Sequence, residues 1–404
     1  MSRQALEGVK VLEIAFIGVT PMTCKLLADQ GAEVVRIESK TRLDYLRTSG
    51  PYVDGIVSIE HSPTTPSLHS NKYGITLNLK HPKGIEIAKK LAAWADVVAN
   101  GFTTGTLEKM GLGYDDLKKD NPDLIMFSCN TFGRTSPLSS FPSTGIQITG
   151  LTGLSQITGW PDRGPSAIGY YTDFCVPHFN FASVLAALDY RRRTGKGQHL
   201  DLSHIETSIY CLAPAIMDYA VNGREFRRQG NRSPSAAPHG AYQCKGEDRW
   251  CAIAVSTDEE WASFCKVIGN PEWTEDPKFS TLLNRKRNEY ELDRHVEEWT
   301  MSRTAHEVMK LMVAAGISAG VVQNGEEVFK DPQLAHYGFQ QMMFYPGMHK
   351  EYPTQLPFGR LTKTPVKARR PSPMLGEHTD YICTQILGIP DEEFVQLMAD
   401  GVFD

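Results

Sequence analysis

Residues 167–180, AIGYYTDFCVPHFN, place one carboxylate, Asp173, inside a run of aromatic and apolar side chains. An aspartate is rarely buried unless it is paired or used in chemistry, so Asp173 is the first candidate for a reacting group. The same string also predicts a simpler role. Aspartate is a preferred N-cap residue, and Pro177 suits the first turn of a helix. From these residues alone, a helix cap and a reacting carboxylate both remain open.

Other sources of chemistry are disfavoured by residue spacing. The eight cysteines form no CxxC pair, and the twelve histidines show no HExxH or similar spacing, which predicts reduced core thiols and no protein metal site. A dinucleotide fold places GxGxxG directly after its first strand. The corresponding stretch here, AFIGVTPM, has the single glycine Gly18. An NAD-dependent dehydrogenase is therefore disfavoured.

Charge and hydropathy exclude two further classes of partner. Acids number 47 and bases 42, for a net charge of −5, and no long basic run predicts nucleic-acid binding. No apolar run approaches the roughly 20 residues that span a bilayer. The first residues, MSRQALEGVKVLEI, contain no hydrophobic signal region, so a cytoplasmic location is expected.

Alternating strand and helix patterns in the first half predict an α/β fold with a parallel sheet. Strands are expected at residues 9–16, 32–38, 96–100, 124–130 and within 194–203. Helices are expected at 21–31, 80–95, 179–193 and, as one long helix, 205–223.

The second half changes character at residues 224–240, which are rich in Arg, Ser, Pro and Gly. A hairpin is predicted over 241–255, helices at 258–269, 287–300 and 305–316, and a helical tail at 371–388 and 390–401. The predicted organisation is a large domain from residues 1–205, a linker helix 206–225, a small α+β domain 226–330, and a return to the large domain at 331–404.

Several motifs, taken in order, extend over nearly the whole chain. They are LEGVKVLEIA, LLADQGAEVVRIE, SNKYGITLNLKHPKG, GLGYDDLKKDNPDLI, RRRTGKGQHLDLS, GNPEW and LGEHT. With these motifs the chain resembles the class III coenzyme A transferases, the formyl-CoA and carnitine-CoA transferase group. The resemblance implies a Rossmann-like large domain built from both chain ends and a smaller α+β domain.

In that family two chains thread through each other as an interlocked dimer. The crossing segments would be residues 205–230 and 325–370, and the active site would lie between the large domain of one chain and the small domain of the other. Homodimers, heterodimers and heterotetramers of related chains are all expected partners.

Asp173 occupies the position of the family's catalytic aspartate, which follows a short strand and opens a helix. The implied chemistry runs through an aspartyl anhydride and an aspartyl-CoA thioester. Coenzyme A or acyl-CoA is then a substrate, and no permanently bound cofactor is expected. An apolar site would protect the anhydride from water. The family's glycine a few residues after the aspartate is replaced here by Val176–Pro177.

The resemblance also implies a coenzyme surface. Its predicted residues are Ile17, Gly18, Lys40, Leu68, Ser70, Asn71, Lys72, Gly101, Phe102, Lys109, Asn130, Thr131 and Phe132. Relatives often carry bases at the positions of Ser39 and Thr103. The phosphates of coenzyme A would therefore depend more on Lys40, Lys72 and Lys109, although each lysine could equally be a solvated surface charge.

Substrate contacts are predicted at Tyr171, beside the aspartate, and at Arg232 and His239 in the small-domain loop 229–242. An arginine there could pair with a substrate carboxylate, or be an exposed linker residue. Aromatic residues together with Arg232 suggest an aryl-substituted succinate as acceptor and succinyl-CoA as donor, as in an arylsuccinate CoA-transferase subunit.

Two alternatives within the same fold remain. An α-methylacyl-CoA racemase would need a His–Asp pair in residues 141–153, FPSTGIQITGLTG, where neither residue type occurs. A non-catalytic partner subunit is suggested by Thr103 and Pro177, and the retained Asp173 argues against it.

Overall fold

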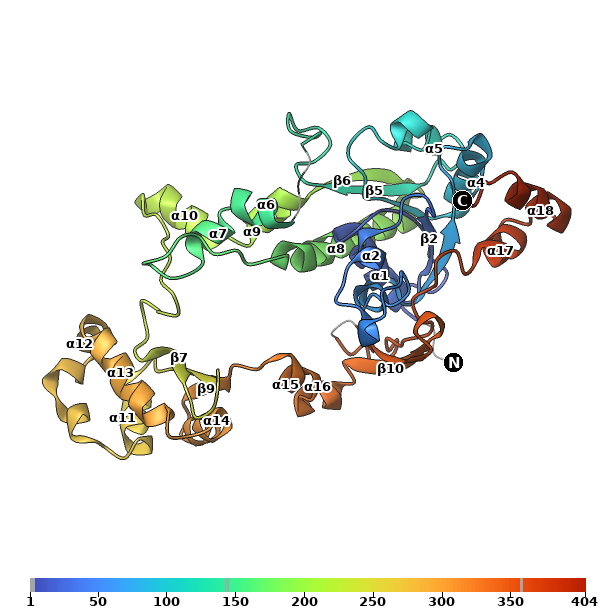
Figure 1. The fold of residues 1–404 in the computed structure, drawn as a ribbon. Helices are drawn as coiled ribbons and strands as arrows, with labels where there is room; N and C mark the ends of the chain where they lie inside the picture. The colour runs from blue at the N-terminus through green and yellow to red at the C-terminus, as the bar shows by residue number, and fades with distance from the viewer. Residues whose placement is uncertain (1–3, 142, 144, 357–358) are drawn as a thin grey trace. The chain divides into compact units, whose positions relative to one another are not determined.

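A computed structural model describes residues 4–141, 143, 145–356 and 359–404, and the chain divides into two compact units (Figure 1). Unit 1 comprises Met1–Leu154, Ala167–Asn222 and Gln333–Asp404, and unit 2 comprises Ser155–Ser166 and Gly223–Pro332. The segment Ser155–Ser166 thus joins unit 2, although it lies far in sequence from the predicted small domain. Gly230 donates a backbone hydrogen bond to Gly159 over 2.8 Å, which ties this segment to the rest of unit 2.

Unit 1 is built on a six-stranded sheet with the strand order β3-β2-β1-β4-β5-β6, and all its strand pairs are parallel. This is the order of doubly wound nucleotide-binding folds, in which the direction of winding reverses between β1 and β4. The strands are β1 (Lys10–Ile14), β2 (Glu33–Glu38), β3 (Lys72–Thr76), β4 (Val97–Asn100), β5 (Ile125–Asn130) and β6 (Gln198–Ser203). The prediction missed β3, whose five residues KYGIT include a lysine and a glycine and give no strand pattern.

Both faces of the sheet are covered, which explains the continuous apolar runs of its strands. On one face Leu12 and Val35 pack with α4 and with residues 382–403 at the C-terminal end of the chain (Figure 1). On the other face Val11 and Val34 pack with α1 and α8.

The helices of unit 1 follow the strands. They are α1 (Val19–Asp29), α2 (Tyr45–Thr48), α3 (Thr64–His69), α4 (Pro82–Trp94), α5 (Tyr114–Leu117), α6 (Gly145–Leu151), α8 (Tyr171–Thr194), α9 (His204–Tyr210), α10 (Ala213–Asn222), α17 (Thr379–Tyr381) and α18 (Asp391–Ala399). Two short helices, α7 (Leu154–Ile157) and α16 (Pro332–Tyr337), span the boundaries between the units.

The predicted linker helix at 206–225 is wrong, because two helices, α9 and α10, stand in its place. Pro214 has no N–H to donate to the carbonyl of Tyr210, and its ring would clash with that carbonyl in a continuous helix. The predicted helical tail is also shorter, since residues 371–375 are irregular and a π-helical turn, Ile382–Ile386, follows α17. A hairpin of β10 (Gln340–Tyr345) and β11 (Lys350–Gln355) was not predicted.

Unit 2 is an α+β fold around a three-stranded antiparallel sheet of β7 (His239–Gln243), β8 (Trp250–Ala254) and β9 (Ser318–Val321). Its helices are α11 (Asp258–Val267), α12 (Leu282–Arg287), α13 (Glu289–Thr300), α14 (Ala305–Ala314) and α15 (Gly325–Phe329). Capping boxes begin α11 at Thr257 and α14 at Thr304, as their Thr-x-x-Glu spacing dictates. Within the described residues, no helix has the length and apolarity to cross a membrane.

Candidate active site

Asp173 lies in the first turn of α8 as its third helical residue. The helix begins at Tyr171 after the N-cap Tyr170, so the interpretation of Asp173 as an N-cap is wrong. A turn rather than a strand precedes it. Pro177 is inside the helix, where it has no N–H to donate to the carbonyl oxygen of Asp173 four residues earlier. The Val176–Pro177 pair is buried, so it forms part of the core beneath the first turns of the helix.

The carboxylate of Asp173 is mostly buried, with 19% of its side chain exposed. Burial raises its pKa to about 6, because a poorly solvated carboxylate is harder to ionise. At pH 7 the group is still mainly ionised, and it is more basic than an aspartate in water. Perturbed carboxylates of this kind cluster at functional sites.

Two residues that the sequence analysis did not select lie against this carboxylate. The Nε2 atom of His204, the first residue of α9, is 3.5 Å from Oδ1 of Asp173. A Cβ atom placed on Gly145, at the start of α6, would come within 2.9 Å of Oδ2. Gly145 belongs to the stretch 141–153 that was searched for a racemase base, and Pro142 and Thr144 of that stretch lie outside the described residues.

His204 could have been found from one signal. It directly follows the predicted short strand in QHLDLS, and the carboxyl ends of parallel strands are where such folds place their ligands and reacting groups. Gly145 gave no such signal, because its importance comes from a close approach that only the fold creates.

Several of the predicted coenzyme residues lie at this same edge of the sheet. Ile17 and Gly18 follow β1, Gly101 and Phe102 follow β4, and Asn130 ends β5, with Thr131 and Phe132 after it. The loops after β1 and β4 touch, since a Cβ on Gly101 would lie 2.9 Å from Cβ of Ala15. The structure therefore places Ile17, Gly18, Gly101 and Phe102 where the sheet reverses its winding, and residues 130–132 one strand beyond that point.

The loop after β1 has a strained backbone. Ile17 has φ of 49°, a region that β-branched residues rarely adopt. Its N–H donates to Oδ2 of Asp44 over 3.3 Å. Asp44 in turn pairs with Arg36, a buried guanidinium that also pairs with Glu13. Buried ion pairs beneath the sheet edge thus hold Ile17 in a conformation that exposes its side chain, which is 39% accessible.

Four of the predicted coenzyme residues, Leu68, Ser70, Asn71 and Lys72, lie from α3 to the start of β3 and do not form an exposed surface. Lys72 is fully buried, and its Nζ lies 2.7 Å from Glu13 and 2.8 Å from the carbonyl of Pro21. Asn71 donates to Asp29 over 2.7 Å and accepts the backbone N–H of Arg369. Leu68 and Ser70 are buried as well. Asn71 connects the sheet to the C-terminal segment, Lys72 connects β3 to β1 and α1, and none of the four side chains is open to solvent.

The other two predicted phosphate ligands are open to solvent. Lys40 has half of its side chain exposed and lies 3.4 Å from Asp404, and Lys109 is exposed. Tyr171 is also exposed, by 55%. These side chains are free to meet a ligand, in contrast to Lys72.

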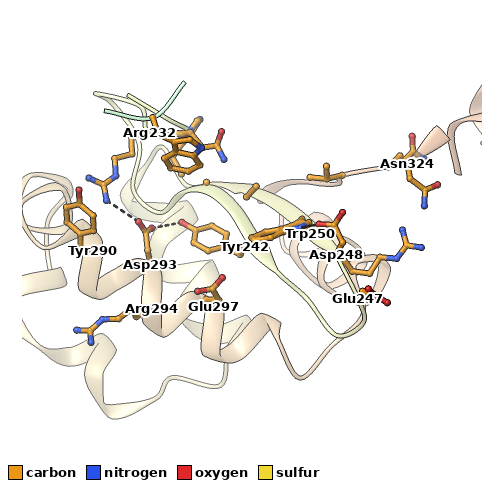
Figure 2. Close-up of a pocket in the computed structure, with 18 residues that line it drawn as sticks. Arg232, Tyr242, Glu247, Asp248, Trp250, Tyr290, Asp293, Arg294, Glu297 and Asn324 are labelled. Atoms are coloured by element: carbon orange, nitrogen blue, oxygen red, sulfur yellow. Dashed lines mark hydrogen bonds and ion pairs between the residues drawn. The ribbon is translucent and has the colours of Figure 1, made fainter. Parts of the chain in front are cut away.

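Arg232 and His239 line a pocket of about 790 Å³ within unit 2 (Figure 2). Arg232 stacks 3.8 Å above the ring of Tyr290 and lies 3.6 Å from Asp293, which also accepts a 2.8 Å hydrogen bond from Tyr242. Glu289 is a second acid beside Arg232, at 3.4 Å. The guanidinium is thus held by internal acids.

His239 is held by the loop that carries Arg232, since its Nδ1 contacts the carbonyl of Asn231. The acids Glu247, Asp248 and Glu297 also line the pocket. Its mixed charge gives it no clear preference for an anionic ligand.

Comparison with known proteins gives a consistent result. A sequence model described as CoA-transferase family III matches residues 6–379. Human succinyl-CoA:glutarate CoA-transferase is 30% identical over 400 residues, covering 99% of this chain and 90% of the relative. Succinyl-CoA–D-citramalate CoA-transferase of Chloroflexus aurantiacus is 32% identical over 405 residues, covering 98% of each chain. The crystal structure of a CaiB/BaiF family protein from Brucella suis matches with a TM-score of 0.87 and 31% identity, over 95% of this chain and 100% of that one.

Proposed function

The chain belongs to CoA-transferase family III and is a CoA-transferase, and we propose that it moves coenzyme A from succinyl-CoA to a dicarboxylic acid with Asp173 as nucleophile. The observation that carries this proposal is the carboxylate of Asp173 at the carboxyl edge of the sheet, with its pKa raised to about 6 by burial. Such a group is ionised at neutral pH and weakly solvated, which suits attack on a thioester.

The proposed reaction has four steps at the side chain of Asp173. One carboxylate oxygen attacks the thioester carbon of succinyl-CoA, and the C–S bond breaks to give an anhydride and CoA thiolate. The thiolate attacks Cγ of Asp173, and succinate leaves with the attacking oxygen. The acceptor carboxylate then attacks Cγ of the aspartyl-CoA thioester and displaces the thiolate. Finally the thiolate attacks the acceptor carbonyl of the new anhydride and restores the carboxylate.

The coenzyme surface that we propose lies along the edge of the sheet in unit 1. Its members are Ile17, Gly18, Gly101, Phe102, Asn130, Thr131 and Phe132, together with the exposed Lys40 and Lys109. Exposed main-chain groups near the glycines let a ligand approach closely, and the two lysines can pair with phosphates. Leu68, Ser70, Asn71 and Lys72 are left out because they are buried.

For the acceptor we propose a short dicarboxylate such as glutarate, the acceptor for which the human relative is named. An aryl-substituted succinate is the second candidate. It is favoured by the exposed rings of Tyr170, Tyr171 and Phe174 around Asp173, which are 54%, 55% and 57% accessible. Contact of Arg232 or His239 with the acceptor stays a prediction, and for Arg232 it requires release from its internal acids.

For the assembly we propose that a second chain covers α9 and α10, as in the interlocked dimer of the family. None of the residues of α10 is buried, and its apolar side chains are widely exposed. Tyr210, Met217 and Tyr219 are 70%, 58% and 60% accessible. An apolar surface of this kind on a soluble enzyme marks a protein–protein contact. Whether the second chain is identical or a related subunit is part of the test.

The variants Asp173→Ala and Asp173→Glu test the proposal, with succinyl-CoA and glutarate or phenylsuccinate as substrates and product CoA esters measured by mass spectrometry. We expect Asp173→Ala to lower the transfer rate by at least about 10³-fold, because no other group forms the acyl intermediate. Hydroxylamine added with succinyl-CoA should label Asp173 of the wild type alone.

Three results would redirect the assignment. Unchanged transfer by Asp173→Ala in the assembled enzyme would make this chain a non-catalytic subunit. Deuterium uptake at the α-carbon of a 2-methylacyl-CoA would support a racemase. A preference for phenylsuccinate over glutarate by kcat/KM would replace the first acceptor candidate by the second.

A further inference from the structure

His204 is fixed in place by the chain around it. It is the first residue of α9, and the Ser203 side chain caps this helix by accepting the N–H of Glu206 over 3.2 Å. The next residue, Ile205, donates its N–H to the carbonyl of Thr131 at the end of β5 over 3.0 Å. The main chain at His204 is therefore anchored where β5 and β6 end, and 6% of the residue is exposed.

The Nε2 atom of His204 is buried, and it faces the carboxylate of Asp173. Within the described part of the chain, Nε2 of His204 has no hydrogen-bond partner, and it lies 3.5 Å from Oδ1 of Asp173. A buried nitrogen without a partner is destabilising, because it has lost its hydrogen bonds to water and gained none in return. Because Nε2 faces the carboxylate of Asp173, its hydrogen-bond partner is expected to be the negative charge that forms on this group during the reaction.

The surroundings favour a neutral imidazole. Burial lowers the pKa of His204 to about 4, so the ring carries no charge at pH 7. Cys129 on β5 stays a neutral thiol, because burial, together with the charges of Asp173 and Asp201, raises its pKa to about 11. Facing the ionised Asp173, the neutral ring is expected to carry its proton on Nε2, where the carboxylate can accept it.

We propose that His204 holds Oδ1 of Asp173 through Nε2–H and stabilises the negative charge that develops on this oxygen during transfer. This inference rests on the proposed function. Oδ2 is then the attacking oxygen. When CoA thiolate adds to Cγ of the anhydride, the carbonyl electrons move to Oδ1. They return as the Cγ–Oδ2 bond breaks and succinate leaves. The same charge forms on Oδ1 when the acceptor attacks the thioester.

A neutral donor suits this reaction better than a cation. Both nucleophiles are anions, so no proton has to be removed and no general base is needed. A protonated histidine would form an ion pair with Asp173 and make the carboxylate a poorer nucleophile. A neutral N–H near an oxyanion contributes mainly in the transition state, where the negative charge on Oδ1 is largest.

The test compares His204→Gln, which keeps an N–H donor, with His204→Met, which has no donor and a similar length. We expect His204→Met to lower kcat by about 10²-fold with KM for succinyl-CoA unchanged, and His204→Gln to recover most of the loss. Removal of the donor should also move the acidic limb of the pH–rate profile to higher pH, because the ionised Asp173 loses a partner.

Ser208→Ala is the matched control, since the Ser208 hydroxyl donates to the His204 carbonyl over 2.8 Å without touching the ring. It should leave kcat within twofold. Equal kcat in His204→Met and the wild type, or equal losses in the Met and Gln variants with a lowered melting temperature, would overturn the inference. Labelling of Asp173 by hydroxylamine separates the two proposals. A wild type that transfers coenzyme A without labelled Asp173 refutes the proposed nucleophile itself.

Discussion

Replacement of Gly145 by alanine is expected to slow transfer by moving the carboxylate of Asp173, the proposed nucleophile. The added Cβ would lie 2.9 Å from Oδ2 and 3.2 Å from Oδ1 of Asp173, and 2.7 Å from Cδ1 of Tyr170. Ordinary contact begins at 3.4 Å, so Oδ2 must retreat by 0.5 Å. Tyr170 is 54% exposed and can turn into solvent, whereas the carboxylate is confined by its surroundings.

The size of the effect follows from that displacement. A misplacement of about 1 Å costs roughly 10²-fold in rate, so half that distance should cost about tenfold, or about 1.4 kcal/mol in the barrier. Stability should fall less than the rate, because alanine has a higher helix propensity than glycine, by up to about 1 kcal/mol in a helix interior and by part of that in the first turn, where Gly145 lies. The assay is kcat for succinyl-CoA and glutarate, together with the melting temperature.

The same helix provides the control. Gly150 is also in α6, but a Cβ there meets no atom within 4 Å. Gly150→Ala should therefore keep the wild-type rate and gain a little stability. If Gly145→Ala transfers coenzyme A as fast as Gly150→Ala, the carboxylate is not held where the structure has it during the reaction, and the reasoning from this contact is refuted.

Three further predictions follow from burial and exposure. Asp173→Asn should have a higher melting temperature than the wild type, by a margin that grows from pH 4 to pH 6. Over this range the unfolded wild type loses the Asp173 proton more readily than the folded state, whose pKa is about 6, so the wild type loses stability and the variant does not. A margin that does not change with pH would contradict this. Lys72→Met should lower the free energy of unfolding by about 3 kcal/mol, because it leaves Glu13 without this partner. Lys40→Met, at an exposed position, should leave the free energy of unfolding unchanged and raise KM for succinyl-CoA at low salt. A raised KM in Lys72→Met with unchanged stability would restore Lys72 as a phosphate ligand. If a second chain covers α10 as proposed, Met217→Glu should lower the mass measured by light scattering to that of one chain, and Met301→Glu, a comparably exposed change in unit 2, should not.

The parallel sheet was predictable because its strands are apolar on both faces and alternate with helices. β3 was missed for the opposite reason. Lys72 is buried in it, and a sequence gives no sign that Glu13, 59 positions earlier, will pair with that lysine. The break between α9 and α10 could have been read from Pro214, since a proline inside a helical pattern predicts an interruption. The mostly apolar sequence of 205–223 concealed it.

The sequence allowed the prediction of Asp173, a single conspicuous residue, but not of the residues that only the fold brings close to it. Asp173 is conspicuous because it is the one carboxylate in its stretch. The position of Asp173 inside the first turn of α8 was not predicted. A helix that begins at Tyr171 contains Pro177 beyond its first turn, where proline is normally disfavoured. His204 is 31 positions away in the sequence, and the carboxyl edge of the sheet is what brings the two together. The burial of Asn71 could not be inferred from the sequence, because the residues that bury it include Arg369 and Arg370 of the C-terminal segment.

The distribution of buried charge is consistent with the proposal that Asp173 acts as the nucleophile. Four described cations of unit 1 are buried, and each is paired: Arg36 and Lys72 with Glu13, Lys25 with Asp29 and Arg47 with Glu38. Through Asp44, Arg36 also supports the loop after β1. Asp173 instead faces a neutral imidazole and Gly145. A nearby guanidinium or ammonium group would lower the pKa of the carboxyl and weaken its attack on a thioester. Among the described residues, ion pairs thus support the loop after β1, whereas the pKa of Asp173 is raised to about 6 by burial alone, which is the state that the proposed attack requires.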